Sequence, residues 1–352
     1  MRYNYDADRW QLQSGLSLQN LNQETAGFLR QGEEAYKDDN LKDINENPEA
    51  YRDSQSARAY TRFEMRGIND EILVITPYVR HTKMAFLQHF LPGTPLEENG
   101  QSSIGMQTGF YHQYSKNVKI HNGFDIDYTQ AWLKQSQEGT TFTSFPSGDQ
   151  YDYDVNALNI AAYLGAEIDL EQGQLNAGGR FEMQRYDYEN NLANGNLDAN
   201  GNPCPSGDCR YSRPGDRKDR YENLSFYLGY IRPLNDSLNF VAHGTQGFRA
   251  PQATELYRLQ QTQTLAKLDP EELLSVEAGF RFQGDTLSGE LIAYAMKKRN
   301  VILQTDDRQN VSDGQTDHKG IEFNVTWQLS EHFALHSQGS YAKHQYSENV
   351  GS

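Results

Sequence analysis

Hydrophobic and polar residues alternate along unusually long stretches of this chain. In Leu158–Leu170 every second residue is apolar, and Asn159, Glu167 and Asp169 stand between apolar neighbours. The same period-two pattern recurs in residues 124–132, 175–183 and 321–329. Because successive side chains of a β-strand point to opposite faces of a sheet, each stretch predicts a strand with one apolar and one polar face. The pattern predicts an all-β chain.

The length of these stretches favours a membrane barrel over a soluble β-protein. Alternating runs of ~10 residues exceed the usual soluble strand of about five to six residues, and they match a tilted transmembrane strand of about nine to eleven. In such a barrel the apolar face meets lipid and the polar face lines a wet lumen, which explains the strongly negative mean hydropathy. The 22 Tyr and 16 Phe suit its aromatic belts. A large soluble β-sandwich or propeller is the alternative.

Short and long connections alternate between the predicted strands. Short turns are predicted near Asn69, Lys116, Gly173, Asn235, Gly284 and Glu331. Long polar loops are predicted over approximately residues 20–57, 82–103, 134–157, 189–220, 249–272 and 304–318. Outer-membrane barrels have short periplasmic turns and long extracellular loops. The connections therefore predict an antiparallel barrel sheet of about 13 strands, with the tail of another strand at Met1–Tyr5.

Charge and cysteine content narrow the possible partners. The formal net charge is -16, so no nucleic-acid partner is expected, because that binding rests on Lys and Arg neutralising phosphates. No apolar run approaches the ~18 residues that a spanning helix needs. Cys204 and Cys209 lie close together in a polar loop. They predict a local disulfide and an oxidising compartment, with a metal-binding pair as the alternative.

The sequence contains no recognisable catalytic or metal-binding motif. No G-x-S-x-G elbow, H-E-x-x-H helix or P-loop occurs, so no catalytic residue and no enzymatic activity are expected. His81 and His89 are predicted near the outer rim and His121 near the periplasmic turn, so these histidines should not share an ion. The Asn- and Asp-rich residues 194–203 lack the closing glutamate of a calcium loop. No metal site is predicted.

The stretch GFRAPQATELY, Gly247–Tyr257, resembles a segment of the TonB-dependent receptors of Gram-negative outer membranes. Three further segments, DPEELLSVEAGFRF, LSGELIAYAMKKRNVI and NVSDGQTDHKGIEFNVTW, resemble the same family and follow in the family's order. Arg249 and Glu255 are expected to form a hydrogen-bonded pair at the base of a loop, and Pro251 should end the strand ladder. The motif residues are Gly247, Arg249, Pro251, Glu255, Leu256, Tyr257, Gly320 and Glu322.

The resemblance covers essentially the whole chain but not a whole receptor. Such a receptor is expected to have a signal peptide, a TonB box, an N-terminal plug domain and about 22 strands. We therefore expect residues 1–352 to be an internal fragment of a transmembrane antiparallel barrel embedded in outer-membrane lipid, with about 13 to 14 strands and without the plug.

The resemblance implies uptake of a scarce nutrient, most often a ferric siderophore or another iron complex. An inner-membrane energy-coupling complex would drive uptake through the plug and TonB box. Iron is then cargo, and no resident cofactor is expected. The loop residues that could hold an anionic chelate by charge-assisted hydrogen bonds and stacking are Tyr36, Tyr51, Arg52, Arg210, Tyr211, Arg213, Arg249, Tyr257 and Arg258. Cobalamin, haem or an oligosaccharide could be the cargo instead, and a secreted or surface β-protein that binds glycans is the alternative class.

Overall fold

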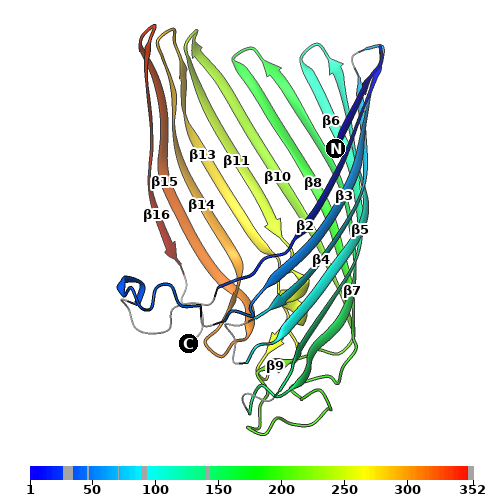
Figure 1. Ribbon diagram of the computed structural model, residues 1–352. Helices are drawn as coiled ribbons and strands as arrows, with labels where there is room; N and C mark the ends of the chain where they lie inside the picture. Colours follow the sequence, from blue (N-terminus) through cyan, green and yellow to red (C-terminus); the bar gives the residue numbers. More distant parts are fainter. Residues whose placement is uncertain (27–34, 46, 70, 89–92, 140–142, 348–352) are drawn as a thin grey trace.

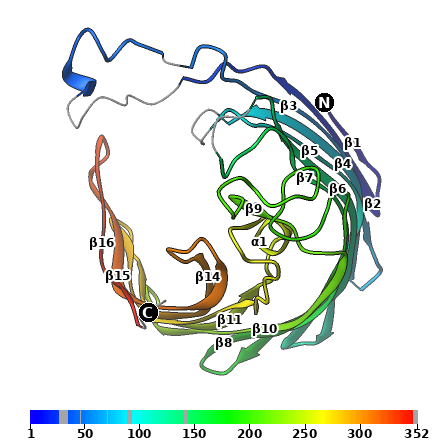
Figure 2. The same cartoon turned by 90° about the horizontal axis from the view of Figure 1, so that it is seen from below.

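The chain forms one large curved sheet. The computed structural model describes residues 1–26, 35–45, 47–69, 71–88, 93–139 and 143–347. Fourteen antiparallel strands follow each other in chain order, and each pairs with the next strand of the sheet. Figures 1 and 2 show this sheet as a wall that curves around a hollow. Within the described residues the first and last strands lie at its two edges and do not pair with each other.

The strands of the sheet are long and the helices are short. The sheet contains β1 (Arg2–Asp6), β2 (Trp10–Leu21), β3 (Arg52–Arg66), β4 (Ile72–Leu87), β5 (Leu96–Ser115), β6 (Val118–Gln137), β7 (Gly148–Leu170), β8 (Gly173–Asn190), β10 (Arg217–Asn235), β11 (Leu238–Arg249), β13 (Glu271–Gln283), β14 (Leu287–Gln304), β15 (Asn310–Ser330) and β16 (Phe333–Tyr346). The connections hold η1 (Ala35–Lys37), α1 (Ala253–Tyr257) and a separate two-stranded pair, β9 (Tyr211–Ser212) with β12 (Leu259–Gln260). No helix in the described ranges is long and apolar enough to cross a membrane.

The predicted all-β sheet and its short turns are confirmed. Each of the six predicted turns separates two consecutive strands, and all six lie at one end of the sheet (Figure 1). The strand tail predicted at Met1–Tyr5 is β1, which pairs with β2 from Arg2↔Gly15 to Asp6↔Gln11. The strand count of 14 also agrees with the prediction.

Three of the predicted long loops are wrong in length. The segments 82–103, 134–157 and 304–318 are mostly strand, and the connections there cover only residues 88–95, 138–147 and 305–309. The polar residues of these segments stay in the ladder, as Leu96↔Ser136 between β5 and β6 shows. Backbone hydrogen bonds hold a ladder together whatever the side chains are. The strands therefore extend beyond the segments in which alternating apolar residues identify them in the sequence.

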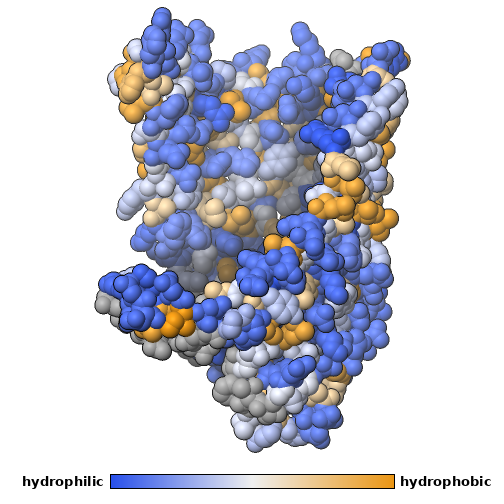
Figure 3. Space-filling view, in the orientation of Figure 1, coloured by the Kyte–Doolittle hydropathy of each residue, from blue (hydrophilic) through white to orange (hydrophobic). Residues whose placement is uncertain are grey.

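The two faces of the sheet differ in chemistry. Large apolar side chains stand exposed on the convex side, and Ile104, Leu164 and Leu228 have exposed fractions of 61%, 62% and 54%. Figure 3 shows such side chains gathered at mid-height over β1 to β3, whereas the end that carries the long loops is mostly hydrophilic. The convex side is therefore the surface that the sequence predicts to contact lipid.

Two long connections fold back into the hollow. Residues 191–216 and 250–270, which carry β9, α1 and β12, lie within the outline of the curved wall in Figure 2 and toward its lower end in Figure 1. They bury a cluster that we call the loop core, which contains Leu133, Phe145, Tyr151, Tyr153, Val155, Tyr186, Tyr188, Cys204, Cys209, Tyr211, Leu256, Tyr257, Leu259, Ala266 and Leu268. The main buried core thus lies at the mouth of the wall, where it positions the loop side chains.

Candidate functional site at the mouth

Arg249 anchors the connection 250–270 at its base. Its Nη1 and Nη2 donate to the two carboxylate oxygens of Glu255 at 3.0 Å each, and its Nε donates to Glu271 Oε2 at 2.9 Å. Glu255 also accepts a hydrogen bond of 2.7 Å from the backbone N–H of Gln252 and so fixes the first turn of α1. The pair expected from the sequence is present. Arg249 is therefore occupied by carboxylates and is not free to hold a ligand.

Tyr257 has a structural place in the loop core. Leu256 and Tyr257 are fully buried, and the Tyr257 hydroxyl donates to Asp219 Oδ2 at 2.8 Å. The Tyr257 ring stacks on Tyr188 with 4.2 Å between the ring centroids. Burial, together with the Asp219 carboxylate, raises the pKa of Tyr257 far above its ordinary value. Tyr257, predicted as a ligand contact, instead holds the loop against the wall.

Arg213 is also a structural residue. Its side chain is almost fully buried, and its Nε, Nη1 and Nη2 donate to the backbone carbonyls of Ala193, Gln150 and Leu197 at 2.7, 2.9 and 2.8 Å. Burial lowers the pKa of Arg213 from its ordinary value. Tyr211, with 2% of its surface exposed, lies beside it in the same core. The structure thus removes Arg213 and Tyr211 from the surface that could contact a ligand.

Cys204 and Cys209 are joined by a disulfide with an S–S distance of 1.98 Å. Both cysteines are buried in the loop core. Asn196 holds the backbone of Cys209 through two hydrogen bonds. Its Nδ2 donates to the Cys209 carbonyl at 2.7 Å, and its Oδ1 accepts from the Cys209 N–H at 2.7 Å. The segment between β8 and β10 is therefore pinned internally.

The remaining predicted contacts do not gather at one place. Arg258 Nη2 pairs with Glu97 Oε2 at 2.6 Å and donates to Gln135 Oε1 at 2.9 Å, which ties the connection 250–270 to β5 and β6. The Arg52 guanidinium lies 4.3 Å from the centroid of the Phe86 ring. Two tyrosines belong to the first long connection, where Tyr36 is exposed on η1 and Tyr51 pairs with Glu24 in an isolated bridge.

Arg210 and Arg308 form the best candidate contact for an anion. Within the described ranges no carboxylate pairs with either guanidinium. Partial burial of Arg210, together with the nearby charge of Arg308, lowers the Arg210 pKa. Arg308 has a φ of 62° at the tip of the β14–β15 connection, and its Nη1 donates to Gln260 Oε1 at 3.4 Å. Two neighbouring cations without a counter-ion favour a bound anion.

Arg308 is not recognisable as a candidate from the sequence alone. The residue follows Asp306 and Asp307, so the local sequence is net acidic and gives no sign of a basic site. The signal lies only in the tertiary structure, where the tip of the β14–β15 connection meets β12 and residue 263. Gln263 Nε2 donates to the Asn310 carbonyl at 2.9 Å and so joins the two connections.

The concave wall below the mouth is polar, and many of its charges are paired. Arg80 pairs with Asp127 at 3.0 Å and Arg180 with Asp125 at 2.7 Å. These pairs line a hollow of about 430 Å³ that reaches up to Ala253 of α1. A wall of this kind can remain hydrated, as the lumen of a barrel requires.

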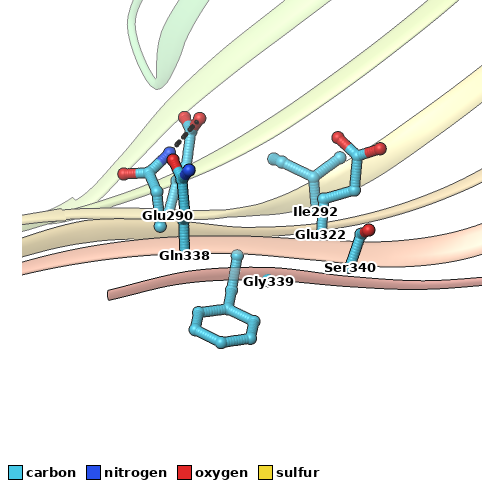
Figure 4. Close-up of a pocket in the computed structure, with 8 residues that line it drawn as sticks. Glu290, Ile292, Glu322, Gln338, Gly339 and Ser340 are labelled. Atoms are coloured by element: carbon cyan, nitrogen blue, oxygen red, sulfur yellow. Dashed lines mark hydrogen bonds between the residues drawn. The ribbon is translucent and has the colours of Figure 1, made fainter. Parts of the chain in front are cut away.

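A second hollow of about 460 Å³ lies on β14, β15 and β16. Figure 4 shows Glu290 and Glu322 among the residues that line it, and Asn324 Nδ2 donates to Glu290 Oε1 at 2.8 Å. Gly320 precedes this hollow on β15, and a Cβ there would lie 2.6 Å from the Tyr341 carbonyl oxygen. At Gly247 an added Cβ would meet no atom within 4 Å, so nothing in the structure explains that glycine.

The predicted histidines lie apart. His81 Nδ1 is 2.9 Å from Ser102 Oγ, and His121 Nε2 is 3.0 Å from the Tyr227 hydroxyl. His89 lies outside the described residues. In the part of the chain that the structure describes, no three or more His, Cys, Asp or Glu side chains are grouped so that they could hold a metal ion.

The sequence matches the family of TonB-dependent receptor-like β-barrels over residues 1–351, and the chain belongs to this family. Proteins of the family are outer-membrane receptors and transporters of Gram-negative bacteria rather than enzymes. Membership explains the two-faced strands, the alternating connections and the inward-folded loops together. No curated protein matches the chain in a sequence search.

Several solved structures have a similar fold. The ferric yersiniabactin uptake receptor FyuA of Yersinia pestis is 11% identical with a TM-score of 0.72, covering 96% of this chain and 50% of that one. The ferric citrate transporter FecA in unliganded form is 16% identical with a TM-score of 0.75, covering 99% and 51%. The ferric-catecholate import receptor Fiu of E. coli K12 is 14% identical with a TM-score of 0.70, covering 97% and 56%. The chain thus spans about half the length of these structures.

Proposed function

We propose that the chain is barrel wall of an outer-membrane receptor that takes up an iron complex, such as a ferric siderophore. The observation that carries the proposal is the family match over residues 1–351, on a sheet with an exposed apolar convex side and a polar concave side. Iron is the cargo named for FyuA and FecA, whose folds are similar. In this proposal a plug domain and an inner-membrane energy-coupling complex act with the wall.

Arg210 and Arg308 are proposed to make the first contact with an anionic iron chelate. Both belong to connections at the mouth, and no carboxylate in the described part of the chain neutralises them. The partial burial of Arg210 strengthens its attraction for an anion, because the local dielectric constant is lower than in water. Tyr36, Tyr51 and Arg52 remain proposed contacts on the first long connection.

Ligand binding by the purified full chain in detergent tests this proposal. The ligands are ferric citrate, a trianionic ferric catecholate, an uncharged ferric hydroxamate, haem, cobalamin and a neutral oligosaccharide. We expect saturable binding of an anionic ferric chelate, measured by quenching of tryptophan fluorescence. Arg210→Gln and Arg308→Gln should each weaken it roughly tenfold, as expected for loss of a charge-assisted hydrogen bond.

Arg185→Gln is the matched control, since Arg185 is half exposed and pairs only loosely with Asp187 at 3.9 Å. It should bind like the unaltered chain. Preference for cobalamin, haem or the oligosaccharide over every ferric chelate would contradict the iron proposal. Equal binding by the Arg210 and Arg308 variants and the unaltered chain would exclude these residues as ligand contacts.

A further inference from the structure

Three neighbouring strands place a methionine and two histidines in one row. Met296 of β14 lies opposite His318 of β15, and His318 lies opposite His344 of β16. Met296, His318 and His344 have even numbers. The odd-numbered residues Leu291 and Ile321 are exposed and mark the convex side of these strands. Because side chains alternate between the two faces of a sheet, the methionine and both histidines stand on the concave side. Directly opposite residues of neighbouring strands have Cβ atoms about 4.5–5.5 Å apart.

The two imidazoles lie within hydrogen-bond distance of each other. Nδ1 of His318 and Nδ1 of His344 lie 2.7 Å apart, and the ring centroids are separated by 4.9 Å. A contact of this kind needs a lone pair on one nitrogen and a proton on the other. Nε2 of His318 lies 2.9 Å from Thr316 Oγ1. A proton on Nε2 can be donated to this hydroxyl, which leaves the Nδ1 lone pair of His318 available for a metal ion.

We propose that Met296, His318 and His344 form a copper-binding site. The copper ion takes the place of the proton between the two Nδ1 atoms, and that proton moves through solvent to Nε2 of its own ring. Both rings then bind as neutral imidazoles. Imidazole suits copper, zinc and nickel, whereas a thioether is a soft ligand that favours Cu(I). The methionine therefore selects copper among these metals.

Little movement is needed to admit the ion. With metal–nitrogen bonds of about 2.0–2.1 Å, the length found for zinc, two nitrogens on a tetrahedral ion lie roughly 3.3 Å apart. The nitrogens must therefore separate by about 0.6 Å from their present distance. His344 is exposed and His318 is half exposed, so neither ring is locked by surrounding atoms.

The charges around the row permit a bound cation. Lys298 is the next residue toward the mouth on the concave side of β14, and its ammonium pairs with Glu271 at 3.7 Å. This pairing reduces its repulsion of an ion. In the other direction Tyr294, Gly320 and Ala342 separate the row from the hollow of Figure 4. Of the two carboxylates of that hollow, Glu290 pairs with Arg281 at 3.3 Å, and the carboxylate of Glu322 attracts cations.

The site is independent of the proposed uptake of an iron complex, because neither arginine of the mouth contributes to it. The first test is the electron paramagnetic resonance spectrum of Cu²⁺ added to the full chain in detergent. We expect hyperfine coupling to imidazole nitrogen at one copper per chain. A spectrum without coupling to imidazole nitrogen overturns the proposal, whatever the behaviour of any variant.

Variants then test each ligand, with Cu(I) affinity measured by competition against a chromophoric chelator. His318→Gln and His344→Gln should each weaken Cu(I) binding roughly tenfold or more, because loss of even an outer partner of a ligand has an effect of that size. Met296→Leu should weaken Cu(I) binding and leave Zn²⁺ binding unchanged. A loss of Zn²⁺ affinity as large as that of Cu(I) would overturn the proposed selection by the thioether.

His336→Gln is the matched control, since His336 also stands on the concave side of β16 and its Nδ1 lies 3.0 Å from Thr326 Oγ1. It should bind copper like the unaltered chain. The shift of gel mobility on heating, which folded barrels show, confirms that each variant is folded. Unchanged affinity in either variant of the histidine pair, or equal loss in His336→Gln, refutes the site.

Discussion

Single arginines decide which parts of the mouth are rigid and which can meet a ligand. Arg213, Arg249 and Arg258 are all bound by carbonyls, carboxylates or an amide, whereas Arg210 and Arg308 have no carboxylate partner within the described residues. The sequence alone presents all five as loop arginines. Their roles differ because the folded chain places a hydrogen-bond acceptor beside some of these arginines and not beside others. The residues next to each arginine in the sequence do not indicate which of them has such an acceptor.

At the residue scale we expect Arg213→Met to loosen the segment between β8 and β10. Methionine can fill much of the same space but donates nothing, so the carbonyls of Ala193, Gln150 and Leu197 lose a charged donor. Hydrogen bonds to charged groups contribute about 1.5–3 kcal/mol each. Limited proteolysis in detergent should cut residues 191–216 faster than in the unaltered chain. Cutting at the same rate would contradict the role given to Arg213.

At the element scale we expect Arg249→Gln to release α1 from the base of its connection. The substitution leaves the carboxylates of Glu255 and Glu271 without their shared cation, at a cost of roughly 1–3 kcal/mol. Amide hydrogen exchange should therefore accelerate in residues 253–257. Arg220→Gln removes an exposed ion pair on β10 and is the control, with no expected change in α1. Slow exchange in the Arg249 variant would show that the loop core alone holds α1.

The elements were predictable where one face is apolar and unpredictable where both faces are polar. The alternation in Leu158–Leu170 predicts the part of β7 that has an apolar face, but residues 148–157, for which the sequence predicts a loop, also belong to that strand. Its polar residues are held by pairing with β6, for example Asp154 with Trp132. Backbone pairing with a segment distant in sequence produces no periodic pattern of apolar residues. The position of the loop core could not be predicted from the sequence for the same reason.

At the scale of the whole molecule, the sheet has two free edges within the described residues. β1 and β16 pair on one side only, whereas β7 pairs on both sides along most of its length. Unpaired edge groups exchange their hydrogens with water or seek another strand. For residues 1–352 in detergent we expect fast amide exchange in β1 and β16 and slow exchange in the centre of β7. Equal protection of edge and centre would indicate that another strand covers the edges.

The length of the strands has a consequence for the thermodynamics of ligand capture. β7 has 23 residues, about twice the nine to eleven that cross a bilayer, so a large part of it rises as paired sheet toward the mouth. In the proposed receptor, the wall beside the loop contacts is thus ordered during folding rather than during binding. A preorganised surface loses little conformational entropy when a ligand arrives. In the proposed receptor, association should therefore not be slowed by ordering of this wall.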